Sequence, residues 1–204
     1  MDEYQTQDQN NEPELKIALH FATPMMCVDN VLEPEEFAKV LKHANALEVT
    51  QTPTEWNGVC SSTYQKHQFL PNVFNPVIKA FEDYGNRFLE ELKYDGSVEI
   101  KNNWLNKYEK GSYQEWHLHA NMFFSGIYIV DAEYAEDVIL FENPSIGELM
   151  NTPPHVAEST IANELITDVY SQTNRLIIFK SYLKHMVPKT NGKRITISAN
   201  MNVK

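Results

Sequence analysis

Apolar residues recur at helical spacing in two places in the first half of the chain. One helix is predicted to begin near Pro34, a residue suited to the first helical turn. A second is predicted to begin at Asn75, as its cap, followed by Pro76 and a broad apolar stripe that ends near Gly96. The apolar positions of the first helix are Phe37, Val40, Leu41 and Ala44, and those of the second are Val77, Ile78, Phe81, Phe88, Leu89 and Leu92.

After Gly96 the pattern changes to short segments rich in β-branched and aromatic residues, which is typical of strands. Several strands at this spacing predict a sandwich or barrel, with the two helices packed against a sheet. We therefore expect a mainly β fold with flanking helices. The segment 50–73 has turn residues and no sustained period, so it is predicted to be irregular, and Trp56 within it has no assigned role. The predicted strands lie within 98–111, 121–132, 137–144, 159–170, 175–183 and 194–203.

The chain has 204 residues, which is enough for one ordinary domain with a sizeable core. Residues 1–13 contain four acids and five Asn or Gln, so we predict a disordered acidic tail. Residues 14–204 are predicted to form a single domain, with helical support over 33–94 and a barrel over 97–203. Two cysteines, no signal-like leader and no long apolar run predict a cytoplasmic protein with reduced thiols and no membrane span.

The charge of the chain is acidic overall, but it is unevenly distributed. The formal net charge is -11, which argues against broad binding to nucleic acid. Residues 175–204 nevertheless carry seven Lys or Arg and no acid, so the preceding 174 residues, with 10 basic and 28 acidic groups, carry -18. The C-terminal segment is either a set of solvated strand faces or a site for a small anion such as a dicarboxylate.

Two histidines stand one residue apart in the segment QEWHLHANMFFSGIYIV. Residues two apart on a strand share a face, so His117 and His119 can share one metal ion, whereas Glu115 is about 13 Å from His119 and is a poor third ligand. An isolated pair of this kind is also common as exposed or hydrogen-bonded core histidines. The remaining histidines (His20, His43, His67 and His155) fit no metal-binding spacing.

The wider context is an ordered set of short motifs. Tyr108 and Gly111 precede the histidine pair. His185 follows far downstream, and eight residues separate it from Arg194, which is followed by Thr196 two positions later. Together with the sequence motifs HLHAN, SGIYIV, FKSYLKHMVP and GKRITISAN, this pattern resembles that of the iron(II)- and 2-oxoglutarate-dependent oxygenases. The similarity is to their prolyl-hydroxylase-like branch, and to phage and marine-bacterial oxygenases that share the HxH motif.

This resemblance, which covers about residues 98–203, implies a double-stranded β-helix, or jelly roll, with a metal inside its open end. It implies that His117, His119 and His185 bind iron(II). It also implies that Arg194 and Thr196, helped by Tyr128, bind the distal carboxylate of 2-oxoglutarate, a role suited to the planar fork of arginine. The activity implied is hydroxylation of a substrate with O2, with release of succinate and CO2. Trp104, Trp116, Phe123 and Phe124 are candidates to line the pocket or to pack the core.

The chain departs from most of this superfamily at one ligand. His119 stands where an aspartate or glutamate is expected, which leaves the site one charge unit more positive and makes zinc or nickel more plausible. Asp131, Asp137 and Glu142 are possible sources of a carboxylate from elsewhere. Two alternatives therefore stay open: a non-catalytic metal-binding jelly-roll recognition module, and a three-histidine cupin-like metalloprotein that does not use 2-oxoglutarate. The substrate, a peptide side chain or a small molecule, is not identified by any motif.

Overall fold

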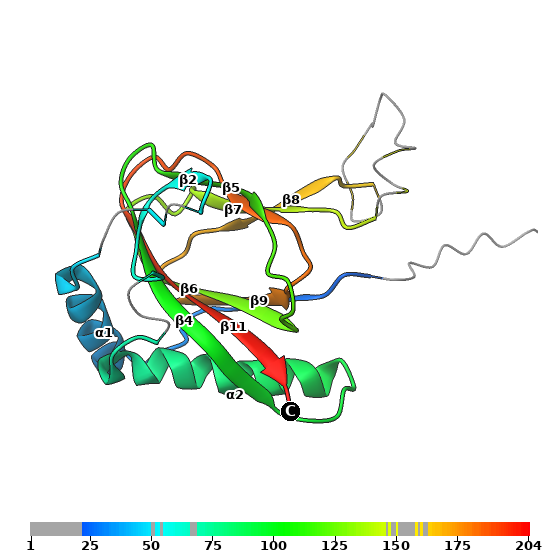
Figure 1. Ribbon diagram of the computed structural model, residues 1–204, viewed down its shortest axis with the longest axis horizontal. Helices are drawn as coiled ribbons and strands as arrows, with labels where there is room; N and C mark the ends of the chain where they lie inside the picture. The colour runs from blue at the N-terminus through cyan, green and yellow to red at the C-terminus, as the bar shows by residue number, and fades with distance from the viewer. Residues whose placement is uncertain are drawn as a thin grey trace, which may run out of the picture.

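The fold is built on two antiparallel sheets that face each other (Figure 1). The computed structural model describes residues 22–49, 52–53, 55–65, 69–145 and 163–204, together with positions 147, 150, 158 and 160. The predicted acidic tail and His20, His67 and His155 lie outside the described residues. In order across the larger sheet, the strands are β1 (Met25–Val28), β9 (Arg175–Lys180), β6 (Phe124–Ala132), β11 (Arg194–Val203), β4 (Val98–Tyr108) and β3 (Ser61–Ser62).

The smaller sheet covers the larger one and is made of shorter strands. Its order is β2 (Gly58–Val59), β5 (Tyr113–His117), β10 (His185–Val187), β7 (Val138–Glu142) and β8 (Ile166–Tyr170). The arrangement confirms the predicted mainly β fold and its jelly-roll architecture. Two predictions need correction: that the segment 50–73 is irregular, and that a strand extends over 159–170. β2 and β3 form in the segment predicted to be irregular, and the predicted strand over 159–170 is β8 alone within the described residues.

Both helices pack against the outer face of the larger sheet. α1 spans Pro34–Ala46, and α2 spans Asn75–Glu91, preceded by a 3-10 turn, η1 (Asn72–Phe74). Asn75 lies inside the first turn of α2 rather than at the cap, a position held by Phe74. α2 runs beneath β4 and β11 (Figure 1) and buries one apolar stripe against them. The buried residues of this stripe are Val77, Ala80, Phe81, Gly85, Phe88 and Leu89.

Two apolar clusters divide the interior. The larger fills the space between the helices and the larger sheet, and includes Phe81, Phe124 and Met201. The smaller lies between the two sheets, where Ile127, Phe141 and other side chains close one end of the barrel. Burial on both faces explains why β6 reads as a continuous apolar run rather than an alternating one. None of the helices in the described part of the chain has the length and apolar character needed to cross a bilayer.

Close packing between β6 and α2 requires a glycine at position 126, in the SGIYIV motif. A Cβ added at this position would lie 2.5 Å from the ring of Phe81 and 3.3 Å from the side chain of Met201. We expect Gly126→Ala to lower the free energy of unfolding by about 1–3 kcal/mol, the usual cost of overpacking a core. Thermal or urea unfolding measures the change.

The double variant Gly126→Ala, Phe81→Leu provides the control for this prediction. The smaller side chain removes the ring that the new methyl group would meet, so the two changes should be less costly together than the sum of their separate effects. Strict additivity, or a Gly126→Ala protein as stable as the wild type, would contradict the packing argument.

Candidate active site

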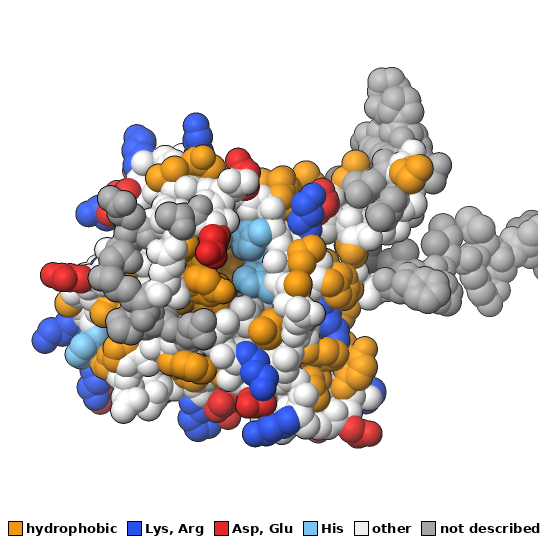
Figure 2. Space-filling view, viewed as in Figure 1, with side chains coloured by type: hydrophobic (Ala, Val, Ile, Leu, Met, Phe, Trp, Pro, Cys, Tyr) orange, Lys and Arg blue, Asp and Glu red, His pale blue; other side chains and the backbone are white. Residues whose placement is uncertain are grey.

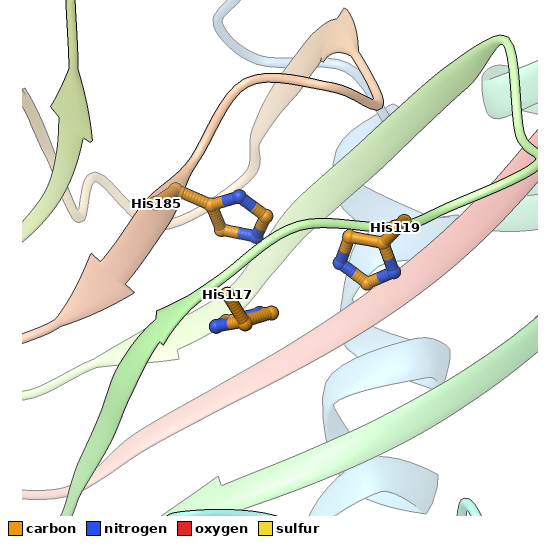
Figure 3. A group of neighbouring side chains, drawn as sticks. All are labelled: His117, His119 and His185. Atoms are coloured by element: carbon orange, nitrogen blue, oxygen red, sulfur yellow. The ribbon is translucent and has the colours of Figure 1, made fainter.

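Three histidines meet at the open end of the barrel. His117 is the last residue of β5, His119 lies in the loop that follows, and His185 begins β10. Figure 3 shows the three rings turned toward one another, and one ring nitrogen from each lies within 4.8 Å of the others. His117 and His185 are directly paired across β5 and β10, with ring centroids 4.2 Å apart. The structure thus brings together all three predicted metal ligands, although His185 is at least 66 positions away from the other two in the sequence.

Backbone contacts leave a free nitrogen on two of these rings. Nδ1 of His117 lies 2.7 Å from the carbonyl oxygen of Glu115, and Nδ1 of His185 lies 2.9 Å from that of Leu183. When Nδ1 donates to a carbonyl, the Nε2 lone pair remains available to a metal, and the ring is held in one orientation. The backbone N–H of His119 donates to the carbonyl oxygen of Ser181 at 3.0 Å, which fixes the loop that carries this residue.

Burial keeps the three rings neutral. It lowers the pKa of His117, lowers the pKa of His119 to about 3 with a further contribution from His117, and lowers the pKa of His185 well below its usual value. Neutral imidazoles are the form that binds metal ions. Phe141 and Phe179 pack against His185, with ring centroids at 5.7 and 4.8 Å, so this ligand has an apolar wall.

No carboxylate joins this group among the described residues, where the only cluster suited to a metal is the three histidines. The three acids considered from the sequence have other positions. Asp137 accepts hydrogen bonds from the backbone N–H and side-chain amide of Asn191, and Glu142 pairs with Lys184 at 3.0 Å. Asp131 lies opposite Ile195 across the larger sheet. Among the described residues, the group that could hold a metal ion therefore offers three imidazole nitrogens and no carboxylate oxygen.

The three histidines line a cavity between the two sheets, and a buried arginine lines this cavity from the larger sheet. Arg194, 1% exposed, donates from Nη1 to the hydroxyl oxygen of Ser171 at 2.8 Å. Its Nε and Nη2 are buried and have no hydrogen-bond partner among the described residues. Burial lowers its pKa, while nearby Tyr108 and Asp137 act in the opposite direction. Unsatisfied charged donors of this kind are costly, and a ligand carboxylate that enters the cavity would satisfy them.

Two neighbours complete this arginine site. Tyr108 is paired with Arg194 across β4 and β11, and the guanidinium carbon lies 4.6 Å from the centre of its ring. The Tyr108 hydroxyl donates to the side-chain oxygen of Gln114 at 3.2 Å, and burial raises its pKa, so it remains a hydrogen-bond donor. Thr196 lies two residues beyond Arg194 on the same strand face and lines the same cavity.

The structure does not place Tyr128 in this cavity, which corrects the prediction from sequence. Tyr128 belongs to the cluster between the larger sheet and the helices, and its hydroxyl donates to the side-chain oxygen of Asn174 at 2.7 Å. Ile127 and Ile129 are the β6 residues that face the other sheet. Tyr108 therefore takes the position beside Arg194 that the sequence argument gave to Tyr128.

A wider pocket of about 450 Å³ opens above the histidines. Figure 2 shows it as a hollow in which two imidazoles are visible beside an acidic side chain and apolar side chains. Trp104 and Trp116 line this pocket, as was considered from the sequence, but Phe124 lies in the core against Phe88. Trp56, to which no role had been assigned, also lines it. The sequence could not predict a role for Trp56, because its segment has no helical or strand periodicity of apolar residues.

The chain matches a known family over residues 102–201, and that family is described as "Putative 2OG-Fe(II) oxygenase". The barrel belongs to the 2-oxoglutarate- and iron(II)-dependent oxygenases. No curated protein sequence gives a significant match to the chain. The family match includes Tyr108, the three histidines, Arg194 and Thr196, so the residues gathered at the open end all fall inside the oxygenase barrel.

Solved structures of other oxygenases share this fold at low sequence identity. A Pseudomonas putida prolyl-4-hydroxylase is 10% identical, with a TM-score of 0.62 over 89% of this chain and 94% of that one. A Trichoplax adhaerens prolyl hydroxylase in complex with a hypoxia-inducible-factor peptide fragment is 11% identical, with a TM-score of 0.64 over 88% and 83%. HygX from Streptomyces hygroscopicus, with nickel, 2-oxoglutarate and hygromycin B bound, is 11% identical, with a TM-score of 0.57 over 89% and 84%. The chain thus shares its barrel fold with these three oxygenases.

The residues of the oxygenase barrel fit both of the groups that this family uses. Three neutral imidazoles with converging nitrogens suit a first-row divalent metal such as iron(II). The unpartnered Nε and Nη2 of Arg194 suit a carboxylate. The three histidines come from the side of the smaller sheet, whereas Arg194, Thr196 and Tyr108 come from β11 and β4 of the larger sheet.

Proposed function

We propose that the protein is an iron(II)- and 2-oxoglutarate-dependent dioxygenase that hydroxylates a peptide side chain or a small molecule, with O2 as co-substrate. The observation that carries this proposal is the buried Arg194, whose two unpartnered donors face the cavity that also holds the three histidines. A barrel that bound only a metal would have no use for an unsatisfied guanidinium at this depth. A three-histidine metalloprotein without 2-oxoglutarate is disfavoured for the same reason.

Each part of the site has a distinct role in this proposal. His117, His119 and His185 would hold the metal, and Arg194 with Tyr108 and Thr196 would bind the distal carboxylate of 2-oxoglutarate. Iron(II) with 2-oxoglutarate would supply an oxidation by O2 in which one oxygen atom enters succinate as the oxo acid loses CO2, and the other converts a C–H bond of the substrate into C–OH.

The apolar wall of the inner cavity protects this chemistry from bulk water. Ile127, Ile139 and Phe179 line the cavity between the two sheets, and each is less than 10% exposed. Excluding water strengthens the attraction between Arg194 and a bound carboxylate, because the local dielectric constant is low. The protein would thereby bind and orient the reactants and exclude water from the cavity.

The substrate enters from the wide pocket above the histidines. Among the similar structures, one contains a peptide fragment and another contains hygromycin B, so this fold accommodates both peptides and small molecules. Nucleic acid is disfavoured as a substrate by the net charge of -11. Cys27 and Cys60 are both free thiols, which supports a reducing, cytoplasmic site of action.

The proposal predicts a visible charge-transfer band when iron(II) and 2-oxoglutarate are added together under anaerobic conditions. The band requires both the oxo acid and the metal at one centre, so it should form in the wild type and disappear in His119→Ala, which loses one of three ligands. Absorbance titration measures it. The wild type without 2-oxoglutarate is the blank.

A second function is favoured by one specific feature, the imidazole at position 119. With three neutral ligands the site holds a divalent metal without the usual carboxylate, which suits a metal-binding recognition module. If folded wild-type protein at saturating iron(II) gave no band and released no succinate, the oxygenase proposal would fail and this module would replace it.

A further inference from the structure

The pocket above the histidines gathers all of the tryptophans in the chain. The sequence has three, Trp56, Trp104 and Trp116, and each of them lines this one pocket. They come from the turn before β2, from β4 and from β5, so the fold collects them from separate segments. Aromatic side chains along the wall of an open cavity are typical of sites that bind a ligand.

Three of the lining rings form a corner whose faces point in different directions. Tyr64 lies 5.2 Å from Trp56 and 5.1 Å from Trp104, measured between ring centroids, at interplanar angles of 44° and 78°. Trp56 and Trp104 are 6.4 Å apart at 65°. Because the rings are not stacked in parallel, a group in the corner meets more than one ring. Trp104 also lies 5.9 Å from His119, so a molecule held there is next to the metal ligands.

The charge around this corner is negative. Glu55 and Glu115 line the pocket, and no Lys or Arg does so among the described residues. The backbone N–H of Glu115 donates to the carbonyl oxygen of Asn57 at 2.9 Å, which joins β5 to the segment that carries Glu55. Neither carboxylate has an ion-pair partner within the described part of the chain. Both are therefore available to a positively charged ligand.

Two buried polar atoms of the same wall are also unsatisfied. In the part of the chain that the structure describes, Nε1 of Trp104, a residue that is only 4% exposed, has no hydrogen-bond partner, and neither has the side-chain oxygen of Asn102. Both residues line the pocket. A buried polar atom without a partner is costly unless something that enters the site provides one. The wall thus offers one free donor and one free acceptor beside the aromatic corner.

We propose that the substrate is a small organic cation, a molecule with a protonated or quaternary ammonium group, which the aromatic corner and the two glutamates hold beside the metal centre. This inference rests on the proposed function, because it names the substrate class of that same site. Aromatic faces attract cations through the negative charge above the ring, and nearby carboxylates add to the attraction. An anionic substrate would be repelled by the same two acids.

The net charge of the proposed metal centre is compatible with a cation bound beside it. Three neutral imidazoles, a divalent metal and the 2-oxoglutarate dianion together carry no net charge. The centre therefore does not repel a cation once 2-oxoglutarate is bound. With a divalent metal alone, the centre carries two positive charges, so we expect the cation to bind after 2-oxoglutarate.

Tryptophan fluorescence of the full-length, metal-free protein tests the proposal directly, because every tryptophan of the chain lines the pocket. The probes are choline and 3,3-dimethylbutan-1-ol, which have the same shape but differ by the positive charge. We expect choline to change the emission saturably and to bind at least tenfold more tightly than the neutral alcohol. Equal binding of the two probes, or no response to either, overturns the proposal.

Charge-matched variants show whether the two pocket acids cause the preference. In Glu55→Gln, Glu115→Gln the advantage of choline should fall below about threefold. The double variant Glu82→Gln, Glu90→Gln, at exposed positions of α2, removes the same two negative charges and should retain the full preference. A preference that survives in Glu55→Gln, Glu115→Gln would mean that overall charge, rather than this pocket, attracts the cation.

This assay needs neither iron nor 2-oxoglutarate, so its failure is distinguishable from failure of the proposed function. A charge-transfer band without a choline preference removes the cation proposal and leaves the oxygenase intact. A choline preference without the band shows a cation site whose ligand is not a substrate, and overturns the inference as stated.

Discussion

Arg194→Leu is expected to weaken binding of 2-oxoglutarate by about two to three orders of magnitude. The guanidinium is buried, and two of its donors are free to bind a carboxylate in the cavity. Loss of a buried, charge-assisted pair costs about 3–4 kcal/mol, which corresponds to this change in affinity. Titration with 2-oxoglutarate at saturating metal measures it, through the charge-transfer band with iron(II) or through calorimetry.

Two further variants separate loss of the ligand contact from loss of structure. Lys193→Leu removes the same charge one position away, on an exposed side chain, and should bind 2-oxoglutarate as the wild type does. Arg194→Lys keeps a charge but loses the planar fork, so we expect an intermediate affinity. If Arg194→Leu remained folded and bound 2-oxoglutarate normally, the carboxylate site would have to lie elsewhere.

His185→Gln is expected to weaken binding of a divalent metal by more than 100-fold. His185 is the most buried of the three ligands, at 2% exposure, and glutamine keeps much of its volume against Phe141 and Phe179. Removal of a group that only supports a ligand typically costs 10- to 100-fold, so removal of a ligand should exceed that range. Equilibrium dialysis with cobalt(II), followed by its visible absorption, measures the affinity.

His43→Gln is the matched control for this experiment. His43 is an exposed histidine on α1, and Nδ1 of its ring lies 2.7 Å from the carbonyl oxygen of Lys39. The substitution removes an imidazole of the same kind outside the barrel, so metal affinity should not change. Equal affinities of the two variants would show that the three histidines do not form the metal site.

The order of the strands and the short motifs made much of the barrel predictable. Residues 194–203 were predicted as a strand and form β11, and α1 begins at Pro34 as expected. The short strands β2 and β3 could not be predicted, because two-residue strands have no period of their own and exist only through pairing at sheet edges. β10 has only three residues and no period either, but it lies inside the smaller sheet, where it pairs with both β5 and β7.

The position of the tyrosine beside Arg194 shows where sequence reasoning fails in physical terms. Tyr128 lies in a run that is buried on both faces, so hydrophobicity alone cannot indicate which side faces the cavity. Tyr108 could be placed only from the register of β4 against β11, which pairs it with Arg194. Trp56 and Tyr64 reach the pocket from a segment without periodicity, so their roles depend on tertiary contacts.

The division of the site between the two sheets has a consequence for how such a protein can diverge. His119 lies beyond the end of β5, and its backbone contact with Ser181 does not depend on its side chain. An exchange of carboxylate for imidazole there leaves the hydrogen bonds of both sheets unchanged. The proposed 2-oxoglutarate site around Arg194, on the opposite sheet, is equally undisturbed. Metal preference can therefore drift during evolution by a single substitution while the fold and the co-substrate site are inherited intact.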